Sequence, residues 1–361
     1  MRSSTILLLT LRALSQETIK NLVLAGVGRL IVMDDQHVSE QDLGAGLLFR
    51  EEDGDVGKKR VTAALPQIKS LNPLVKITPL PTLAPFITSA TSSDLSTEQP
   101  AEKETMEEFL KREKVDLVCA TDLTMQEMGR INTACRATNT LFYGAGSYGY
   151  LGWIFNDLGE KYEWVTTSQT TSSAAAAQSK TLKKQVSYTP FSEAFSSGSN
   201  PFEGMKRNET REKLPALVLG VLSIWEYQSA HAGKLPNSSA AEPELMQLAE
   251  KKRLEFGVNE KAMKSMPEDL ITYAFPSSAL SLPLPPLTAG QLITRPSLSH
   301  LAITAPYEFA PTAAILGGLL AQDILRALSR REKPVMNFLC VDTMAGNGAV
   351  TKWGVKEESD V

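Results

Sequence analysis

The stretch Ile6-Leu7-Leu8-Leu9-Thr10-Leu11-Arg12-Ala13-Leu14-Ser15 decides the fold class of this chain. Its apolar first part predicts a buried strand, and Gln16–Ala25 predicts a helix because apolar residues recur there at helical spacing. Glycines then end the helix, and Arg29–Met33 predicts a second strand. A strand, a tight turn, a helix and a second strand together form the βαβ unit of nucleotide-binding folds.

The turn Thr10–Ser15 lacks every glycine that a phosphate-binding turn needs. Glycine permits positive φ and lets the backbone approach an anion, whereas Leu11, Ala13 and Leu14 would place Cβ atoms where phosphate oxygens lie. Asp34 follows the second strand, about 20 residues after the turn, where dinucleotide folds place an acid that binds ribose. We therefore expect an inherited nucleotide-binding shape that binds a triphosphate poorly.

The 361 residues have an ordinary globular composition, with 42% hydrophobic residues, 22% charged residues and a net charge of -4. This balance gives no sign of a nucleic-acid or membrane partner. Cys119, Cys135 and Cys340 are widely spaced in apolar segments, so we expect them to be buried rather than to form disulfides or a metal site. With three histidines in the chain, we expect neither a zinc site nor a Cys/His or Ser/His catalytic arrangement. The apolar run at the start is too short for a secretory signal, and we expect no targeting segment.

Residues 1–165 alternate strands with helices, which predicts an α/β fold with a mostly parallel sheet and helices on both faces. Within this part we expect a polar loop over residues 35–55 and a surface insertion over residues 86–105. Residues 166–185 are a low-complexity Thr/Ser/Ala run that predicts a linker. Residues 186–275 predict an inserted helical segment. The helices expected in it are Leu214–His231, Glu242–Phe256 and Pro267–Phe275.

Residues 276–304 predict a Pro/Ser-rich loop, and residues 305–361 predict the C-terminal part of the α/β domain with a polar tail. Pro311 is suited to the first turn of a strongly apolar helix, and Val335–Asp342 predicts a strand that returns to the sheet. Gly317-Gly318 lies inside that helix at a cost of about 1 kcal/mol per glycine. We therefore expect another backbone element to cross the helix closely at this point.

Two further features stand at predicted strand ends. Gly144, Gly146 and Gly149 match the spacing G-x-G-x-x-G, but the aromatic residues after them predict a strand rather than a helix that faces an anion. We expect a structural turn with close backbone packing there. Asp122 ends a predicted strand, as Asp34 does, at the sheet edge where α/β folds bind ligands. Capping of the following turn is the alternative role for both acids.

Taken in order, these segments resemble the adenylation domain of ubiquitin-like activating enzymes of the ThiF/MoeB type. The N-terminal residues that carry the resemblance are Ile6–Leu9, Lys20–Asp34, Val38–Gly44, Val56-Gly57 and Leu71-Asn72-Pro73. The C-terminal residues, Phe309–Ser329 and Asp342–Gly348, are more specific, and with the others they resemble the smaller, non-cysteine subunits of SUMO-activating members of that family. The loops over residues 86–105, 166–185 and 276–304 fall outside the resemblance.

The resemblance implies a Rossmann-like ThiF/MoeB adenylation fold and a non-catalytic role in a heterodimer. A larger, cysteine-bearing subunit would bind ATP and Mg, adenylate SUMO, capture it as a thioester and pass it to a SUMO-conjugating enzyme. This chain would bind no cofactor or metal, contain no catalytic residue, be inactive alone, and reside in the nucleus or also in the cytoplasm. The alternatives are the corresponding subunit for neddylation, a stand-alone nucleotide-binding α/β enzyme, or a scaffold without an enzymatic partner.

The resemblance also assigns candidate positions for a vestigial cofactor site. Active subunits hold ATP and Mg with a glycine-rich turn, an acid after the second strand, an arginine, a lysine and an aspartate. Here Asp34 matches the ribose acid, Lys59 or Arg60 lies near the lysine, and Asp122 matches the magnesium aspartate. The arginine-glutamine pair of the family is replaced by Ala45-Gly46. The resemblance therefore implies that the cations of the ATP site are lost.

One position concerns the partner's ATP site. Family members carry a helix ahead of the first strand, with an arginine that reaches into the ATP site of the other subunit. This sequence begins where that helix would be ending, which leaves Arg2 as the candidate for the contribution in trans. Whether the true N-terminus is longer, or the contribution is lost, stays open from the sequence.

Overall fold

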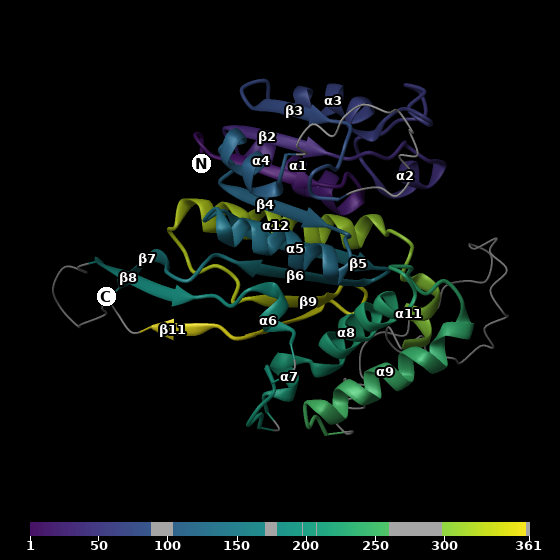
Figure 1. The fold of residues 1–361 in the computed structure, drawn as a ribbon, viewed down its shortest axis with the longest axis vertical. Helices are drawn as coiled ribbons and strands as arrows, with labels where there is room; N and C mark the ends of the chain where they lie inside the picture. Colours follow the sequence, from purple (N-terminus) through teal and green to yellow (C-terminus); the bar gives the residue numbers. More distant parts are fainter. Residues whose placement is uncertain (88–103, 170–178, 197, 207, 260–297, 359–361) are drawn as a thin grey trace.

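A central sheet of eight strands organises the molecule (Figure 1). The computed structural model describes residues 1–87, 104–169, 179–196, 198–206, 208–259 and 298–358. The strand order is β10-β9-β6-β5-β4-β1-β2-β3, in which β1 to β5 pair in parallel and β6, β9 and β10 are added antiparallel. These strands are β1 (Thr5–Leu9), β2 (Arg29–Met33), β3 (Lys76–Leu80), β4 (Leu117–Thr121), β5 (Leu141–Tyr148), β6 (Leu151–Asp157), β9 (Phe338–Asp342) and β10 (Asn347–Thr351). The predicted α/β class and mostly parallel sheet are confirmed.

Helices cover both faces of the sheet, and the strand sequences show why. Successive side chains of a strand point to opposite faces. In β1, Ile6 and Leu8 join one apolar cluster while Leu7 and Leu9 join another, and all four are fully buried. The helices that contribute buried residues to the first cluster are α1 (Ala13–Leu24), α3 (Arg60–Leu71) and α12 (Ala310–Ser329). The helices that contribute to the second are α4 (Met106–Glu113), α5 (Met125–Ala137), α6 (Phe191–Ala194), α8 (Pro215–Ala230), α9 (Glu242–Glu255) and α11 (Leu298–Thr304).

The helix α12 crosses α1 closely at Gly317, as the sequence predicted. A Cβ atom on Gly317 would lie 2.6 Å from the Cβ of Glu17 and 3.1 Å from both the Leu14 carbonyl oxygen and the Thr18 nitrogen. A Cβ on Gly318 would meet nothing within 4 Å. The first glycine is therefore required by packing, whereas the second is not.

The predicted strand Val335–Asp342 corresponds to β9, which pairs with β6 in the central sheet. The predicted helices Leu214–His231 and Glu242–Phe256 are confirmed as α8 and α9, which lie below β9 in Figure 1. The predicted helix Pro267–Phe275 and most of the loop over residues 276–304 lie outside the described residues. None of the described helices is long and apolar enough to cross a membrane.

Two predictions of irregular structure are wrong. The polar loop expected over residues 35–55 contains the short helix α2 (Glu40–Ala45). The ends of the expected linker over residues 166–185 belong to β7 (Tyr162–Gln169) and β8 (Ser179–Ser187), which pair antiparallel in a second sheet with β11 (Lys356–Glu358). A Thr/Ser-rich segment is compatible with a paired strand as well as with a linker. Because strand pairing depends on residues far apart in the sequence, local composition did not predict the pairing of β7 with β8.

The remaining described elements are short. They are α7 (Thr210–Lys213) and the 3-10 turn η1 (Ser239–Ala241). Most of the insertion expected over residues 86–105 lies outside the described residues. Its first residue, Phe86, is buried and packs edge-to-face on Phe109 of α4.

Candidate functional site

The turn between β1 and α1 is held to the end of β4. Thr10 has φ +70°, a left-handed conformation that is uncommon for threonine. Its hydroxyl donates to the carbonyl oxygen of Thr121 at 2.8 Å. This bond fixes the turn at the carboxyl edge of the sheet, which is the edge where α/β folds bind ligands.

Three successive amides of this turn already hold oxygens of the protein itself. The Leu11 nitrogen donates to Asp34 Oδ2 at 2.7 Å, the Arg12 nitrogen to Ser15 Oγ at 2.8 Å, and the Ala13 nitrogen to Glu308 Oε1 at 3.0 Å. In phosphate-binding turns such amides point at the ligand. Here two of the three hold carboxylates, so the anion position is occupied from within.

The prediction that the side chains of Leu11 and Leu14 block the phosphate position is wrong. Both side chains are fully buried and belong to the same apolar cluster as Ile6 and Val32. They fill the core beneath the turn rather than the space where a ligand would lie. The amides are unavailable because they are hydrogen-bonded, and Glu308 was not predicted from the sequence.

Asp34 lies at the end of β2, as predicted, but its carboxylate faces the protein. Besides the Leu11 amide it accepts a hydrogen bond from the Gln36 nitrogen at 2.7 Å, and Arg60 Nη1 lies 3.6 Å from its Oδ2. The side chain is 1% exposed, and burial raises the pKa of Asp34 although these donors oppose the rise. Its hydrogen bonds are those of a cap, which was the alternative role.

The lysine and arginine near the expected phosphate position are also engaged. Lys59 donates through Nζ to the carbonyl oxygen of Asp35. Arg60 binds both carboxylate oxygens of Asp42, at 2.9 and 3.0 Å, and is largely buried. Asp42 is a helix-capping residue of α2, since it accepts from the Ser39 nitrogen at 2.7 Å. Lys59 and Arg60 therefore stabilise the surrounding loops through hydrogen bonds to residues of this chain.

Asp122 lies beyond the end of β4 with φ +54°. Its Oδ1 accepts from the Ser147 nitrogen at 3.2 Å, and its Oδ2 is buried without a hydrogen-bond partner among the described residues. Burial raises the pKa of Asp122, and the nearby Arg12 opposes this. Within the described ranges, no group of three or more His, Cys, Asp or Glu side chains is arranged to hold a metal ion.

Arg2 lies at the amino end of β1, at the opposite edge of the sheet from the turn. It lines a groove of about 680 Å³ together with Gln322, Leu325 and Arg326 of α12. The structure thus separates Arg2 from Asp34, Lys59 and Asp122, which are on the carboxyl side.

The remaining motifs are structural. All three cysteines are buried, as predicted, and burial raises the pKa of Cys119 to about 12. Gly144 and Gly146 lie within β5, and Gly149 has φ +60° in the turn to β6. The predicted turn is therefore found only at Gly149. A Cβ on Gly146 would lie 2.8 Å from Trp153 Nε1, so the close neighbour of this glycine is a side chain rather than backbone.

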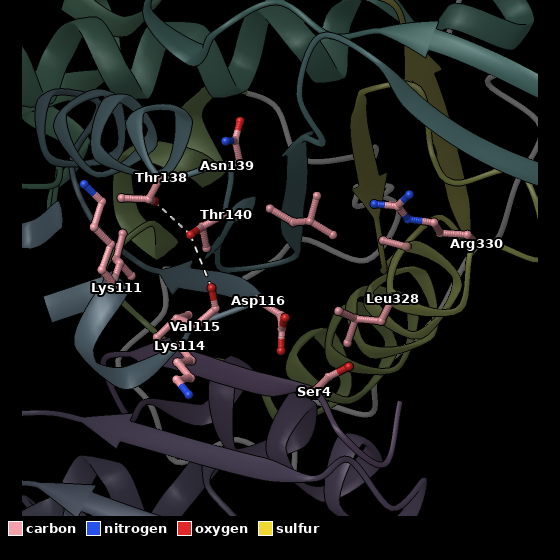
Figure 2. A pocket seen from close by; sticks show the side chains of 13 residues that line it. Ser4, Lys111, Lys114, Val115, Asp116, Thr138, Asn139, Thr140, Leu328 and Arg330 are labelled. Carbon is pink, nitrogen blue, oxygen red and sulfur yellow. Dashed lines mark hydrogen bonds between the residues drawn. The ribbon is translucent and has the colours of Figure 1, made fainter. Parts of the chain in front are cut away.

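A second pocket, of about 410 Å³, lies at the amino edge of the sheet (Figure 2). Lys111, Lys114 and Arg330 are among its lining residues, but Figure 2 shows their charged ends on different sides of the pocket. Its floor carries a hydrogen-bonded chain in which Thr138 meets Thr140 at 2.8 Å. Parallel sheets bind ligands at the opposite edge, and we assign no function to this pocket.

Comparisons with known proteins agree with this architecture. The model of the ThiF family matches residues 1–359. The chain is 28% identical to the human protein named SUMO-activating enzyme subunit 1, over 99% of this chain and 90% of that protein. It is 25% identical to the Xenopus tropicalis protein of the same name, over 99% and 91% of the two chains. The Saccharomyces cerevisiae DNA damage tolerance protein RHC31 is 27% identical, over 95% and 88%. The chain therefore belongs to the ThiF family.

Proposed function

We propose that this chain is the non-catalytic subunit of a heterodimeric SUMO-activating enzyme and has no adenylation activity alone. The larger, cysteine-bearing subunit would bind ATP and Mg, adenylate the C-terminal glycine of SUMO and capture it as a thioester. Similarity over nearly the whole chain to proteins named SUMO-activating enzyme subunit 1 supports the choice of modifier. The internally occupied turn is the observation that carries the non-catalytic role.

The charges around the turn support this role. Adenylation develops negative charge on the transferred phosphate, which active sites stabilise with cations and amides aimed at it. Here Arg12 pairs with Glu308 at 3.4 Å and Arg60 with Asp42 at 2.9 Å. A triphosphate would have to displace these carboxylates, and Asp122 would repel it.

The cysteines support placing the thioester in the partner. A nucleophilic cysteine needs a lowered pKa and access to substrate. Cys119, Cys135 and Cys340 are all 0% exposed, and burial raises the pKa of each thiol. The capture of SUMO then requires a cysteine on another chain.

The helix α12 offers an apolar surface for that partner. Its inner face packs on α1, while Ile315 is 45% exposed and Leu319 is 38% exposed on the other side. These residues are four apart and therefore lie on one face of the helix, with Gly318 beside them. We propose that this face meets the ThiF-type domain of the larger subunit.

Arg2 would extend the same interface. Its groove is lined by Gln322 and Leu325, which continue along α12 from Leu319. An arginine at this place could contribute to the partner's ATP site in trans. Replacing Arg2 by alanine should lower adenylation by the heterodimer, whereas Arg331→Ala, in the same groove, serves as the matched control.

The wider setting follows from the role. We propose that SUMO and the SUMO-conjugating enzyme associate through the complex, that neither nucleic acid nor membrane is a partner, and that the chain acts in the nucleus and also in the cytoplasm. ATP and Mg belong to the partner subunit.

ATP–pyrophosphate exchange tests the proposal. We expect no exchange by the isolated chain with SUMO, and strong exchange and thioester formation when the larger subunit is added. Exchange by the isolated chain would favour a stand-alone enzyme. The neddylation modifier is the control for modifier identity, and failure to co-purify a cysteine-bearing homologue would favour a scaffold.

A further inference from the structure

We propose that the groove beside the C-terminal half of α12 binds an acidic segment of the larger subunit, with Arg326 and Arg331 as the residues that pair with its carboxylates. This inference rests on the proposed heterodimer and deepens it, because it assigns the chemistry that the partner presents at this groove.

The groove is basic in a chain that is acidic overall. Its charged lining residues are Arg2, Arg326, Arg331 and Glu332, which are three arginines against one glutamate, whereas the whole chain has a net charge of -4. Arg2 and Arg331 are exposed and form no ion pair with any described residue. The groove therefore carries positive charge that this chain does not neutralise.

The fourth charged residue shows which chemistry the arginines bind. Glu332 pairs with Arg326, with Oε2 2.9 Å from Nε, and its own side chain is 66% exposed. An exposed pair of this kind contributes little to stability, so a carboxylate from another chain can replace Glu332 at low cost. Guanidinium groups bind carboxylates through paired N–H donors, which favours an acidic partner.

The floor of the groove is apolar. Leu325 and Leu328 line it and pack against the apolar cluster that α12 shares with α1. Basic side chains above an apolar floor suit a peptide segment, whose aliphatic carbons can cover the leucines while its carboxylates meet the arginines. Nucleic acid fits less well, because its binding depends on many cations along the phosphate backbone.

The groove continues the exposed face of α12 that we assign to the partner. Ile315, Leu319, Gln322 and Arg326 are spaced by four, three and four residues, which places them on one face of the helix. This face is apolar at its N-terminal end and basic at its C-terminal end. Protein interfaces have the same division into an apolar centre and a polar rim in which arginine is common.

Association kinetics of the full chain with the larger subunit test the proposal. At low salt, Arg331→Glu should lower the association rate constant about 10-fold, because charges at the rim of an interface steer the encounter. Arg130→Glu is the matched control: Arg130 is an exposed arginine of α5, which packs on the other face of the sheet. Glu332→Gln should raise the rate about 3-fold, since it frees Arg326 and removes a repelling charge.

Two further readouts separate this role from a structural one. The melting temperature should stay unchanged in all three variants, because the altered side chains are exposed. Adenylation at saturating larger subunit should also stay unchanged in Arg331→Glu, since the groove acts on association.

The outcomes distinguish this proposal from the subunit role. Equal rates for Arg331→Glu and Arg130→Glu, or a slower rate for Glu332→Gln, would overturn the acidic segment while leaving the heterodimer intact. Absence of any complex with the wild-type chain would overturn both proposals. A single-stranded oligonucleotide that binds the isolated chain and is released by Arg331→Glu would overturn the assignment in favour of nucleic acid.

Discussion

Two regions of α1 differ in their use of glycine. The turn at its N-terminus lacks the glycines of a phosphate-binding turn, whereas its crossing with α12 keeps the glycine that close packing requires. The turn has no glycine, and its amides hold Asp34, Ser15 and Glu308 instead of a ligand. The crossing has Gly317, where a Cβ would lie 2.6 Å from Glu17. Residues that the fold needs are present, while those that phosphate binding needs are not.

The largest expected effect is at the crossing. Gly317→Val should lower the free energy of unfolding by about 3 kcal/mol or more, because its Cβ meets the backbone of α1 at 3.1 Å. Gly318→Ala is the matched control, since a Cβ there meets nothing within 4 Å and alanine favours a helix by about 1 kcal/mol. Urea denaturation measures both. Equal changes in the two variants would mean that the helices do not pack as described.

The next largest effect is the pH dependence of folding stability that Glu308 contributes. Burial raises the pKa of Glu308 from 4.5 to about 7. The unfolded chain loses this proton near pH 4.5 and the folded chain near pH 7, so the folded state binds more protons between them and stability falls as pH rises through this window. At 1.36 kcal/mol per unit, the loss is about 3 kcal/mol at most.

Glu308→Gln should lack this contribution, and the difference between wild type and variant isolates it from other buried acids. Stability curves from urea denaturation at several pH values between 4.5 and 8 provide the measurement. If the two proteins change in parallel over this range, Glu308 is not the buried carboxylate that we describe.

A smaller effect concerns the exposed face of α12. Ile315→Asp should weaken association with the larger subunit about 30-fold, which is about 2 kcal/mol, because a charge would be buried at the interface. The isolated chain should keep its stability, since Ile315 is 45% exposed. Met246→Asp is the control, because Met246 is an exposed apolar residue of α9, which packs on the other face of the sheet. Sedimentation or titration calorimetry gives the affinity, and unchanged binding would remove α12 from the interface.

The smallest effect is expected from placing a glycine in the turn at Ala13, because Leu11 belongs to the core and cannot be removed without loss of stability. Ala13→Gly should not produce ATP binding, because Asp34 and Glu308 still hold the amides and the nearby cations are paired. Equilibrium dialysis with labelled ATP measures this. ATP binding by the glycine variant would show that side-chain bulk, as first predicted from the sequence, closes the turn after all.

Much of the fold followed from local sequence. The strand Arg29–Met33 has the predicted bounds, and the apolar helix with Pro311 in its first turn and the crossing at Gly317 were predicted from composition and spacing alone. The positions of Asp34 and Asp122 at strand ends were predicted as well. Each of these depends on periodicity or on a single residue type with strong conformational preferences.

The contacts of the site could not be predicted in the same way. Glu308 reaches Ala13 across 295 residues, and an acid ahead of an apolar helix has no local signal for a distant amide. The pairing of β7 with β8 is likewise a property of the folded chain, because a Thr/Ser-rich segment is compatible with strand or coil. The burial of Leu11 and Leu14 was also not predicted, and it shows that hydrogen-bonded amides, rather than these side chains, prevent phosphate binding at the turn.

Binding of ATP with Mg to the isolated full chain, measured by titration calorimetry at neutral pH, tests the central claim most directly. We expect no saturable heat up to millimolar ATP, because the amides of Leu11 and Ala13 hold carboxylates of the chain itself. Saturable binding in the micromolar range, with the Ala13 amide signal moved by ATP, would contradict it.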